Sequence, residues 1–233
     1  ELTGFIIALL VTLRIMPEAF RPWNILSWDD LKAWWKLAFP LVGQFLTTVF
    51  TWTAFFFFVE KVGSMELKVS HVTRNFFMLA FIGTQGMQQT ARTYVSGLLG
   101  AGRLADLNQT LRRIFVITFL GIILFCHGYI LYPSKLAALF FTDATGQAAM
   151  IKTLHVLFIV VCTYAFTGVM LSTIQGSGKT KVAFRIELVA VTIYMIAAAT
   201  ITLIWPQPIW IIWRVELVYF LSIGFGSWLY LRK

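Results

Sequence analysis

Charged side chains are scarce in this sequence: they make up 12% of its 233 residues, about half the share found in an ordinary soluble domain. Apolar residues make up 59%, with 22 phenylalanines and 9 tryptophans among them. This balance excludes an ordinary water-soluble domain and indicates helices whose solvent is a lipid bilayer. No stretch has the alternating pattern of a β-strand. We therefore expect an all-α membrane protein with the bilayer as its first partner.

Cysteine and histidine are also rare, which excludes several kinds of site. The two cysteines, Cys126 and Cys162, lie inside apolar runs and lack the spacing of a disulfide or metal site. The histidines, His71, His127 and His155, are scattered and form no HExxH pattern. No Ser–His–Asp set and no catalytic pair of carboxylates is recognisable. We expect no metal, no other cofactor and no enzymatic activity.

The stretch TIQGSGKTKV, residues 173–182, ends like a phosphate-binding P-loop but fails the other requirements of that motif. A P-loop has a glycine five positions before the Gly of GK, and here that position holds Thr173. It also follows a β-strand, whereas long apolar runs flank this stretch on both sides. We therefore expect no nucleotide, and we interpret the glycines as a tight turn between two membrane helices.

The formal net charge of +9 does not predict a nucleic-acid partner, because the basic residues flank apolar segments. Cytoplasmic loops of membrane proteins carry an excess of Lys and Arg. The richer set of loops holds Arg14, Arg21, Lys32, Lys36, Arg103, Arg112, Arg113, Lys179, Lys181, Arg185, Arg232 and Lys233. The opposite set holds Lys61, Lys68, Lys135 and Lys152. We expect residues 176–180 and the C-terminus to face the cytoplasm of a bacterial inner membrane.

Six apolar segments reach the roughly 20 residues that a membrane-spanning helix needs. They are Leu37–Val59, Leu67–Leu99, Ile114–Leu131, Thr153–Ile174, Leu188–Trp205 and Ile209–Leu231. The chain starts without Met inside an apolar run, so we interpret residues 1–16 as the end of a preceding membrane helix in a longer protein. Residues 17–36 predict a cytoplasmic linker, in which Ser27, Asp29 and Asp30 favour a helix start. Residues 37–233 then form one six-helix lobe.

Polar side chains inside these segments predict a pathway, because a polar face in lipid must meet protein or water. The first full helix carries Gln44, Thr47, Thr48 and Thr51 on one stripe, and the second carries His71, Arg74, Gln85, Gln88, Gln89, Arg92 and Ser96. For the threonines, interhelical hydrogen bonding and a cavity fit equally well. For the stretch from Gln85 to Arg92 we favour a water-accessible cavity.

Two acids, Glu187 and Glu216, also lie inside apolar segments. A carboxylate within the membrane indicates either ion coupling or a structural ion pair, and the sequence leaves both open. Glu216 lies deep in its segment and needs a partner, for which Arg92 and Arg185 are the candidates.

Four short stretches follow one another in the order, and on the loops, of a known transporter family. They are Lys36-Leu-Ala-Phe-Pro40, Gly86 with Ala91, Val95 and Gly100-Ala-Gly-Arg103, Leu139-Phe-Phe-Thr-Asp143, and Gly176-Ser-Gly-Lys-Thr180. Together they resemble the multidrug and toxic compound extrusion (MATE) family. The likeness covers residues 36–180, and the number of helices extends it to the C-terminus.

The resemblance implies twelve helices in two six-helix lobes, of which this chain is the C-terminal lobe and lacks its N-terminal partner. It also implies efflux of small molecules, chiefly organic cations, by antiport with H⁺ or Na⁺, through a cavity between the lobes. Two alternatives stay open: a lipid-linked saccharide flippase of the same superfamily, and a membrane scaffold subunit that transports nothing.

Two acids of one subgroup of the family are replaced here. The position eight residues after Pro40 holds Thr48, and the position twelve residues before Gly176 holds Tyr164. Neither side chain carries a charge near neutral pH. We therefore keep Tyr164 and Thr48 as pathway residues and expect the coupling acid in the N-terminal lobe, with Glu187 and Glu216 as the alternative.

Overall fold

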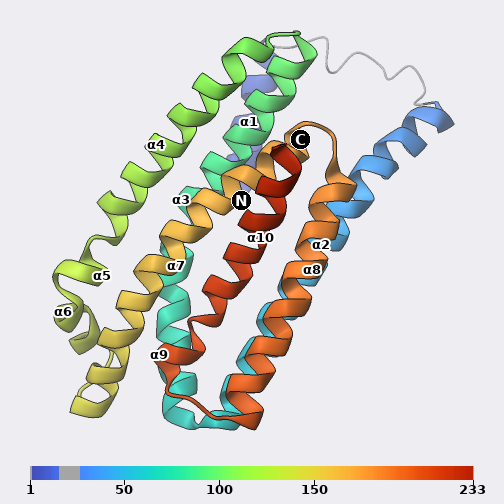
Figure 1. Cartoon of the computed structure of the whole chain (residues 1–233). Helices are drawn as coiled ribbons and strands as arrows, with labels where there is room; N and C mark the ends of the chain where they lie inside the picture. The colour runs from blue at the N-terminus through green and yellow to red at the C-terminus, as the bar shows by residue number, and fades with distance from the viewer. Residues whose placement is uncertain (1, 16–26, 233) are drawn as a thin grey trace. The chain divides into compact units, whose positions relative to one another are not determined.

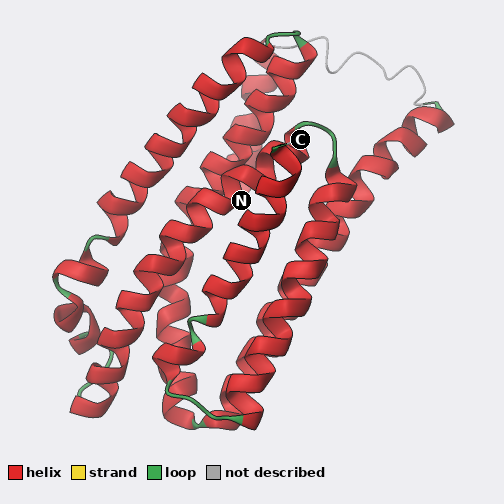
Figure 2. Ribbon diagram, viewed as in Figure 1, coloured by secondary structure: helices red, strands yellow, loops and turns green. Residues whose placement is uncertain are grey.

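The computed structural model describes residues 2–15 and 27–232, which belong to two compact units, residues 1–39 and 40–233. Every regular element in the described residues is a helix (Figure 2), which confirms the all-α prediction. The smaller unit contains α1 (Leu2–Ile15) and the first part of α2 (Trp28–Val62). Residues 16–26, which include the first half of the expected linker and Arg21, lie outside the described residues.

A capping box starts α2 at Trp28, earlier than the predicted Leu37. The Asp30 backbone N–H donates to the Ser27 hydroxyl at 3.2 Å, and that hydroxyl donates to the Asp30 carboxylate at 2.7 Å. Asp29 and Asp30 also place negative charge in the first turn, where the helix dipole favours it. The helix start predicted at Ser27 is thus confirmed, and it belongs to the same helix as the first membrane span.

The larger unit contains the remaining helices (Figure 1). In chain order they are α3 (Ser64–Gly100), a 3₁₀ turn (Leu104–Asp106), α4 (Leu107–Cys126), α5 (Gly128–Leu131), α6 (Pro133–Ala138), α7 (Ala144–Gly176), α8 (Thr180–Ala199), a π-helical turn (Thr200–Ile204), α9 (Ile209–Ile212) and α10 (Val215–Leu231). Five segments of the described chain are long and apolar enough to span a membrane. The remaining predicted span, Leu67–Leu99 in α3, is not among these five, because α3 has the length at 37 residues but carries more polar side chains.

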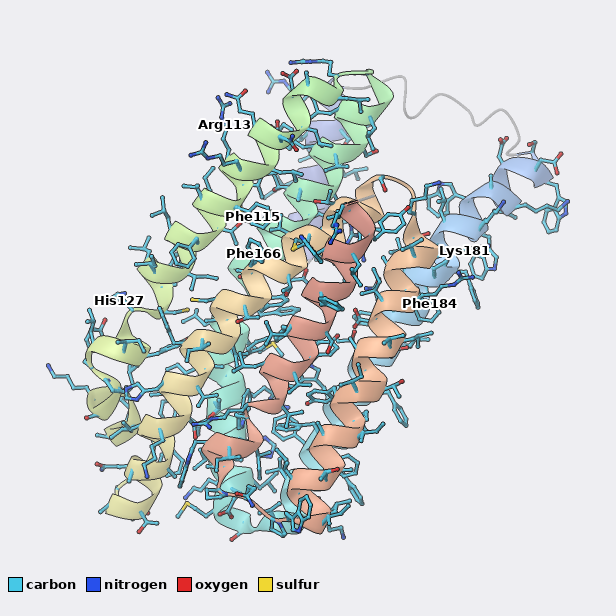
Figure 3. All side chains as sticks on the ribbon, in the orientation of Figure 1. Arg113, Phe115, His127, Phe166, Lys181 and Phe184 are labelled. Atoms are coloured by element: carbon cyan, nitrogen blue, oxygen red, sulfur yellow. The ribbon has the colours of Figure 1, made fainter. Side chains whose placement is uncertain are left out.

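The third predicted span, Ile114–Leu131, ends earlier than expected. In the structure α4 stops at Cys126, and the chain bends over Gly128, where a Cβ would lie 2.7 Å from the Tyr132 ring. The Tyr132 hydroxyl lies 2.6 Å from His127 Nε2, which fixes the bend. His127 therefore stabilises a turn (Figure 3) rather than packing along a straight helix.

Helix α7 is the central element of the larger unit. It packs against α3, α4, α8 and α10, so buried residues cover most of its circumference and leave one exposed stripe that includes Lys152, His155, Ile159 and Phe166. Its contact with α4 includes Phe115 and Phe166, whose ring centroids lie 5.0 Å apart (Figure 3). This central helix sets the positions of the others.

Two glycines let α7 approach α3 closely. A Cβ on Gly176 would lie 2.6 Å from the backbone oxygen of Arg92, and a Cβ on Gly168 would collide with the Gln88 side-chain amide. Small residues at such contacts let helix backbones meet in membranes. Two residues on, Gly178 adopts a left-handed φ of +77°, which the tight turn to α8 requires. The GSG stretch thus forms the tight turn that its sequence predicted, and it also allows a close helix contact that the sequence analysis did not predict.

The turns at 100–107 and 176–180 lie at one end of the larger unit together with the C-terminus, and the links 62–64 and 204–209 lie at the other (Figure 1). This alternation agrees with the spans that the sequence predicts. Which end faces the cytoplasm stays a prediction.

We predict that Gly176→Ala destabilises the fold by about 1–3 kcal/mol, because the added methyl group must push α7 away from the α3 backbone. Gly97→Ala is the matched control: it lies in a helix where an added Cβ would meet no atom within 4 Å, so the better helix propensity of Ala should leave stability unchanged or about 1 kcal/mol higher. Reversible unfolding in mixed detergent micelles measures both. Equal stability of the two variants would contradict the close contact.

Candidate functional site: a buried polar network

The carboxylate of Glu187 on α8 lies inside the larger unit, with 3% of the residue exposed. Gln44 Nε2 donates to Glu187 Oε2 at 3.1 Å, and the Tyr219 hydroxyl donates to Oε1. The Thr48 hydroxyl also lies 3.1 Å from Oε1, although it shares its one proton with the Gln44 carbonyl oxygen at 3.0 Å. Within the described part of the chain no basic group lies within 4.0 Å of Glu187. The carboxylate is therefore held by hydroxyl and amide donors alone.

Two glutamine side chains connect this carboxylate to an arginine. Gln44 Oε1 accepts from Gln175 Nε2 at 2.8 Å, and Gln175 Oε1 accepts from Arg92 Nη2 at 2.5 Å. Both amides point the same way, with nitrogen toward Glu187 and oxygen toward Arg92. Hydrogen bonds aligned in this way polarise one another. A negative charge on Glu187 and a positive charge on Arg92 at the two ends favour this orientation.

The network extends across five helices. Arg92 comes from α3, Gln175 from α7, Gln44 and Thr48 from α2, Glu187 from α8 and Tyr219 from α10. The network resembles an ion pair between Glu187 and Arg92 in which two glutamine amides separate the charged groups. A direct ion pair would tie only two helices, whereas this arrangement joins all of the larger helices of the unit except α4.

The second intramembrane acid, Glu216 on α10, is 2% exposed and accepts a hydrogen bond from the Tyr194 hydroxyl at 2.7 Å. The arginine partner considered from the sequence is absent within 4.0 Å among the described residues, because tyrosine fills that place. The arrangement is reciprocal: each acid is capped by a tyrosine from the opposite helix. The rings of Tyr194 and Tyr219 lie 5.5 Å apart, edge to face.

The polar stripe of α3 divides into two faces. Gln88 and Arg92 point toward α7, whereas Gln85 and Gln89 are exposed. Residues three apart on a helix differ by about 60° in direction, which is enough to separate the two pairs. Gln88 Nε2 and Arg92 Nε are buried without a hydrogen-bond partner among the described residues. The sequence predicted one shared polar face, and this is wrong: Gln88 and Arg92 form a buried edge of α3, and Gln85 and Gln89 form an exposed edge.

The other candidates lie outside the network. His71 stacks on Phe56 with ring centroids 5.0 Å apart, and the Arg74 guanidinium lies 5.0 Å from the same ring. Thr51 is buried and donates to the Thr47 carbonyl oxygen. Tyr164 is buried in an aromatic cluster, stacked on Phe81 at 5.6 Å.

Sequence reasoning missed three members of the site: Gln175, Tyr194 and Tyr219. The available signal was weak. Gln175 is a lone amide at the end of an apolar run, directly before the GSGKT turn, and the same argument that singled out the other glutamines applies to it. Tyrosines are too common in membrane helices to be singled out by type alone.

Comparisons with known proteins bear on the family and the fold of the chain. Residues 40–201 match the family model described as MatE, which is well over half of the chain. The fold is similar to that of a solved MOP superfamily transporter from Pyrococcus furiosus, with a TM-score of 0.71 at 12% sequence identity. The match covers 84% of this chain and 44% of that chain, so the present chain spans less than half of that transporter's length. No curated protein matches the sequence.

We predict that Arg92 and Glu187 are energetically coupled through the two amides. Arg92→Gln and Glu187→Gln should each destabilise the chain, and the double variant should lose about 1 kcal/mol less than the sum, because each single change leaves an uncompensated charge. In a Gln44→Leu background the interaction energy should fall below about 0.3 kcal/mol. Unfolding in mixed micelles measures all six variants and their two parents. Coupling that survives Gln44→Leu would rule out this connection.

We also predict that the exposed edge of α3 meets water. In a background without Cys126 and Cys162, cysteines at Gln85 and Gln89 should react with a charged thiol reagent, and a cysteine at the buried Gln88 should react at least tenfold more slowly. Leu120→Cys on α4 is the control, since it is 58% exposed but surrounded by other exposed apolar side chains. Labelling is followed by mass spectrometry in vesicles. Protection at Gln85 and Gln89 equal to that at Leu120 would indicate lipid or a dry seam instead.

Proposed function

The chain belongs to the MatE family, and we propose that it works as the C-terminal half of a secondary transporter that exports small organic compounds in exchange for H⁺ or Na⁺. That the chain is a multi-pass transporter part follows from the family match and the shared fold. The finer statement rests on the polar network around Glu187. The N-terminal lobe that the proposal requires would complete a cavity of which this chain provides one wall.

The exposed edge of α3 is the wall that we assign to the substrate. His71, Gln85 and Gln89 are exposed on this helix, which is the most polar of the six spans. Amide groups can hydrogen-bond to a polar substrate without demanding a fixed charge. We expect organic cations as substrates, and the acidic group that balances their charge would then come from the other lobe.

We assign ion coupling to Glu187 rather than to an acid in the N-terminal lobe. One observation carries this choice: the Thr48 hydroxyl, on the position where the resemblance expects an acid, lies 3.1 Å from Glu187 Oε1. Helix α8 thus brings a carboxylate to the place where α2 would otherwise carry one. The hydroxyl oxygens of Thr48 and Tyr219 lie at the same carboxylate oxygen, whereas Gln44 turns its amide nitrogen toward Glu187. A proton fits this set as it stands, and Na⁺, which prefers oxygen ligands, would need the Gln44 amide to turn its oxygen toward the acid.

Protonation of Glu187 would change how α2 is held. Ionised, the carboxylate accepts charge-assisted hydrogen bonds from Gln44 and Thr48 and balances Arg92 through the amides. Protonated, it loses that charge, and the same bonds become roughly half as strong. Farther along α2, Phe55 and Val59 are fully buried and do not depend on the acid. A proton would therefore loosen α2 near Gln44 while its other end stays packed, which biases the equilibrium between two conformations.

For orientation, we propose that the end with the turns at 100–107 and 176–180 faces the cytoplasm of a bacterial inner membrane. The support is the excess of Lys and Arg near that end, including Arg103, Lys179 and Lys181.

The test is efflux of a fluorescent organic cation by the full-length transporter in vesicles with an imposed H⁺ or Na⁺ gradient. Glu187→Gln should reduce gradient-driven efflux at least tenfold while substrate binding stays, because the side chain keeps its shape but can no longer change charge. Glu216→Gln is the matched control: an equally buried acid outside the Arg92 network, whose replacement should leave coupling intact. Normal gradient-driven efflux by Glu187→Gln would return the coupling role to the other lobe.

A rescue variant sharpens this test. Thr48→Glu combined with Glu187→Ala moves the carboxylate from α8 to α2 and leaves room for it, since the two side chains touch at 3.1 Å. Coupled efflux should return to a substantial fraction of the original rate, while Thr48→Gln with Glu187→Ala stays inactive. Equal inactivity of both double variants would show that the position of the acid on α8 matters, and not merely its charge.

A further inference from the structure

A cleft of about 420 Å³ opens where α7 passes the junction of α9 and α10. Helix α9 lies at the end of the unit opposite the 176–180 turn (Figure 1). One wall carries Lys152, His155 and Ile159 of α7, and the facing wall carries Trp210, Arg214 and Leu217. The spacing i, i+3, i+7 on α7 and i, i+4, i+7 on the other wall makes two parallel stripes. Each stripe begins with polar or aromatic residues and ends in an aliphatic one.

The cleft is basic and its positive charges are unbalanced. Lys152 Nζ lies 4.3 Å from the centre of the Trp210 ring, which holds the ammonium group over the opening. In the described ranges 2–15 and 27–232 the ion pairs within 4.0 Å are Lys32–Asp29 and Arg103–Asp106, so neither Lys152 nor Arg214 has an acidic partner there. Glu66 lines the adjoining cleft but forms no ion pair with Lys152. A negatively charged ligand would supply the missing counter-charge.

The depth of the cleft in the membrane indicates what kind of anion reaches it. Arg214 and Arg232 flank α10 and lie about 27 Å apart along the helix at about 1.5 Å per residue. That distance matches the roughly 30 Å hydrocarbon core of a bilayer, so the two arginines mark its two surfaces. Trp210 beside Arg214 is typical of the interfacial layer.

Past the cleft, toward the bilayer centre, the exposed side chains of both helices are apolar. Ile159 continues the α7 side, and Val218, Leu221 and Phe225 continue the α10 side. A ligand with an anionic head and a long apolar tail fits the basic cleft together with the apolar surface beyond it. A small soluble anion would contact only the basic cleft.

We propose that this cleft binds an anionic phospholipid of the leaflet opposite the basic end of the protein. Its phosphate lies between Lys152, His155 and Arg214, and its acyl chains follow the apolar face of α7 and α10. The lipid phosphate balances basic residues on the side of the membrane where Lys and Arg are otherwise few. The bound lipid clamps α7 to the α9–α10 junction, one helical turn from Glu216, and this assignment is independent of what the transporter carries.

The test measures lipid retention by the full chain with native mass spectrometry. The chain is purified in detergent with equal amounts of phosphatidylglycerol and phosphatidylcholine that share the same acyl chains. We expect a clear preference for phosphatidylglycerol, which Lys152→Gln with Arg214→Gln lowers about tenfold or more, since each basic group near a lipid phosphate contributes several-fold to binding. Both residues are exposed, so the fold should stay, and circular dichroism checks it.

Two further variants separate this site from general charge effects. Lys61→Gln with Arg232→Gln removes the same charges from similar places, because Lys61 lies over Phe57 at 5.2 Å and Arg232 over Trp228 at 5.0 Å. This control should keep the preference, as should Lys152→Arg with Arg214→Lys, which keeps the charges in the cleft. Equal losses in the control and the cleft variant, or a loss in the charge-preserving variant, would overturn the proposal.

A last arm distinguishes a lipid from a soluble anion. Glycerol 3-phosphate at roughly 10-fold molar excess over the lipid should not displace phosphatidylglycerol, because it lacks the chains that contact α7 and α10. Displacement by glycerol 3-phosphate, or by inorganic phosphate, would assign the cleft to a soluble phosphate and contradict the lipid.

Discussion

A carboxylate inside a membrane-embedded bundle cannot be solvated by lipid, and the structure of the larger unit depends on how that constraint is met at Glu187. A buried ion pair would neutralise the charge, but it would fix two helices rigidly and leave little room for change. Here hydroxyl and amide groups surround the acid, and the balancing guanidinium of Arg92 lies two glutamines away. The charge is compensated, yet no single contact is too strong to be broken.

The helices of the larger unit are held in two ways, some by close packing and one, over half of its length, by hydrogen bonds. The α3–α7 contact depends on glycine, with backbone so close that even a methyl group must displace it. The half of α2 near Gln44 depends instead on polar bonds, because Phe45, Leu46 and Phe50 there are exposed. Its other half packs Phe55 against Trp213, with ring centroids 5.7 Å apart. Rigid packing around α7 therefore supports one helix whose polar half is held mainly by hydrogen bonds to a single acid.

The helices could be predicted from sequence because each apolar run nearly determines a membrane span, but their ends could not. Helix α2 begins at a capping box outside the apolar run, and α4 ends where Gly128 meets the Tyr132 ring, which is a contact that only folding creates. For the candidate site too, one part could be predicted from the sequence and another could not. The acids and glutamines are recognisable because polar groups are costly in lipid. Their partners depend on the packing of five helices, and the difference of about 60° between Gln85 and Gln88 decides which of the two is buried.

The contact between Thr48 and Glu187 shows why residue type at one position is a weak guide to where a charge lies in the fold. By sequence alone, the threonine at position 48 removes an acid from α2 and favours a coupling acid in the N-terminal lobe, with Glu187 and Glu216 as the alternative. In three dimensions α8 brings its own carboxylate to within 3.1 Å of that hydroxyl. A carboxylate can reach this place in the fold from position 48 on α2 or from position 187 on α8. What must be preserved is the surrounding set of donors, and here Gln44, Thr48 and Tyr219 provide them from two different helices.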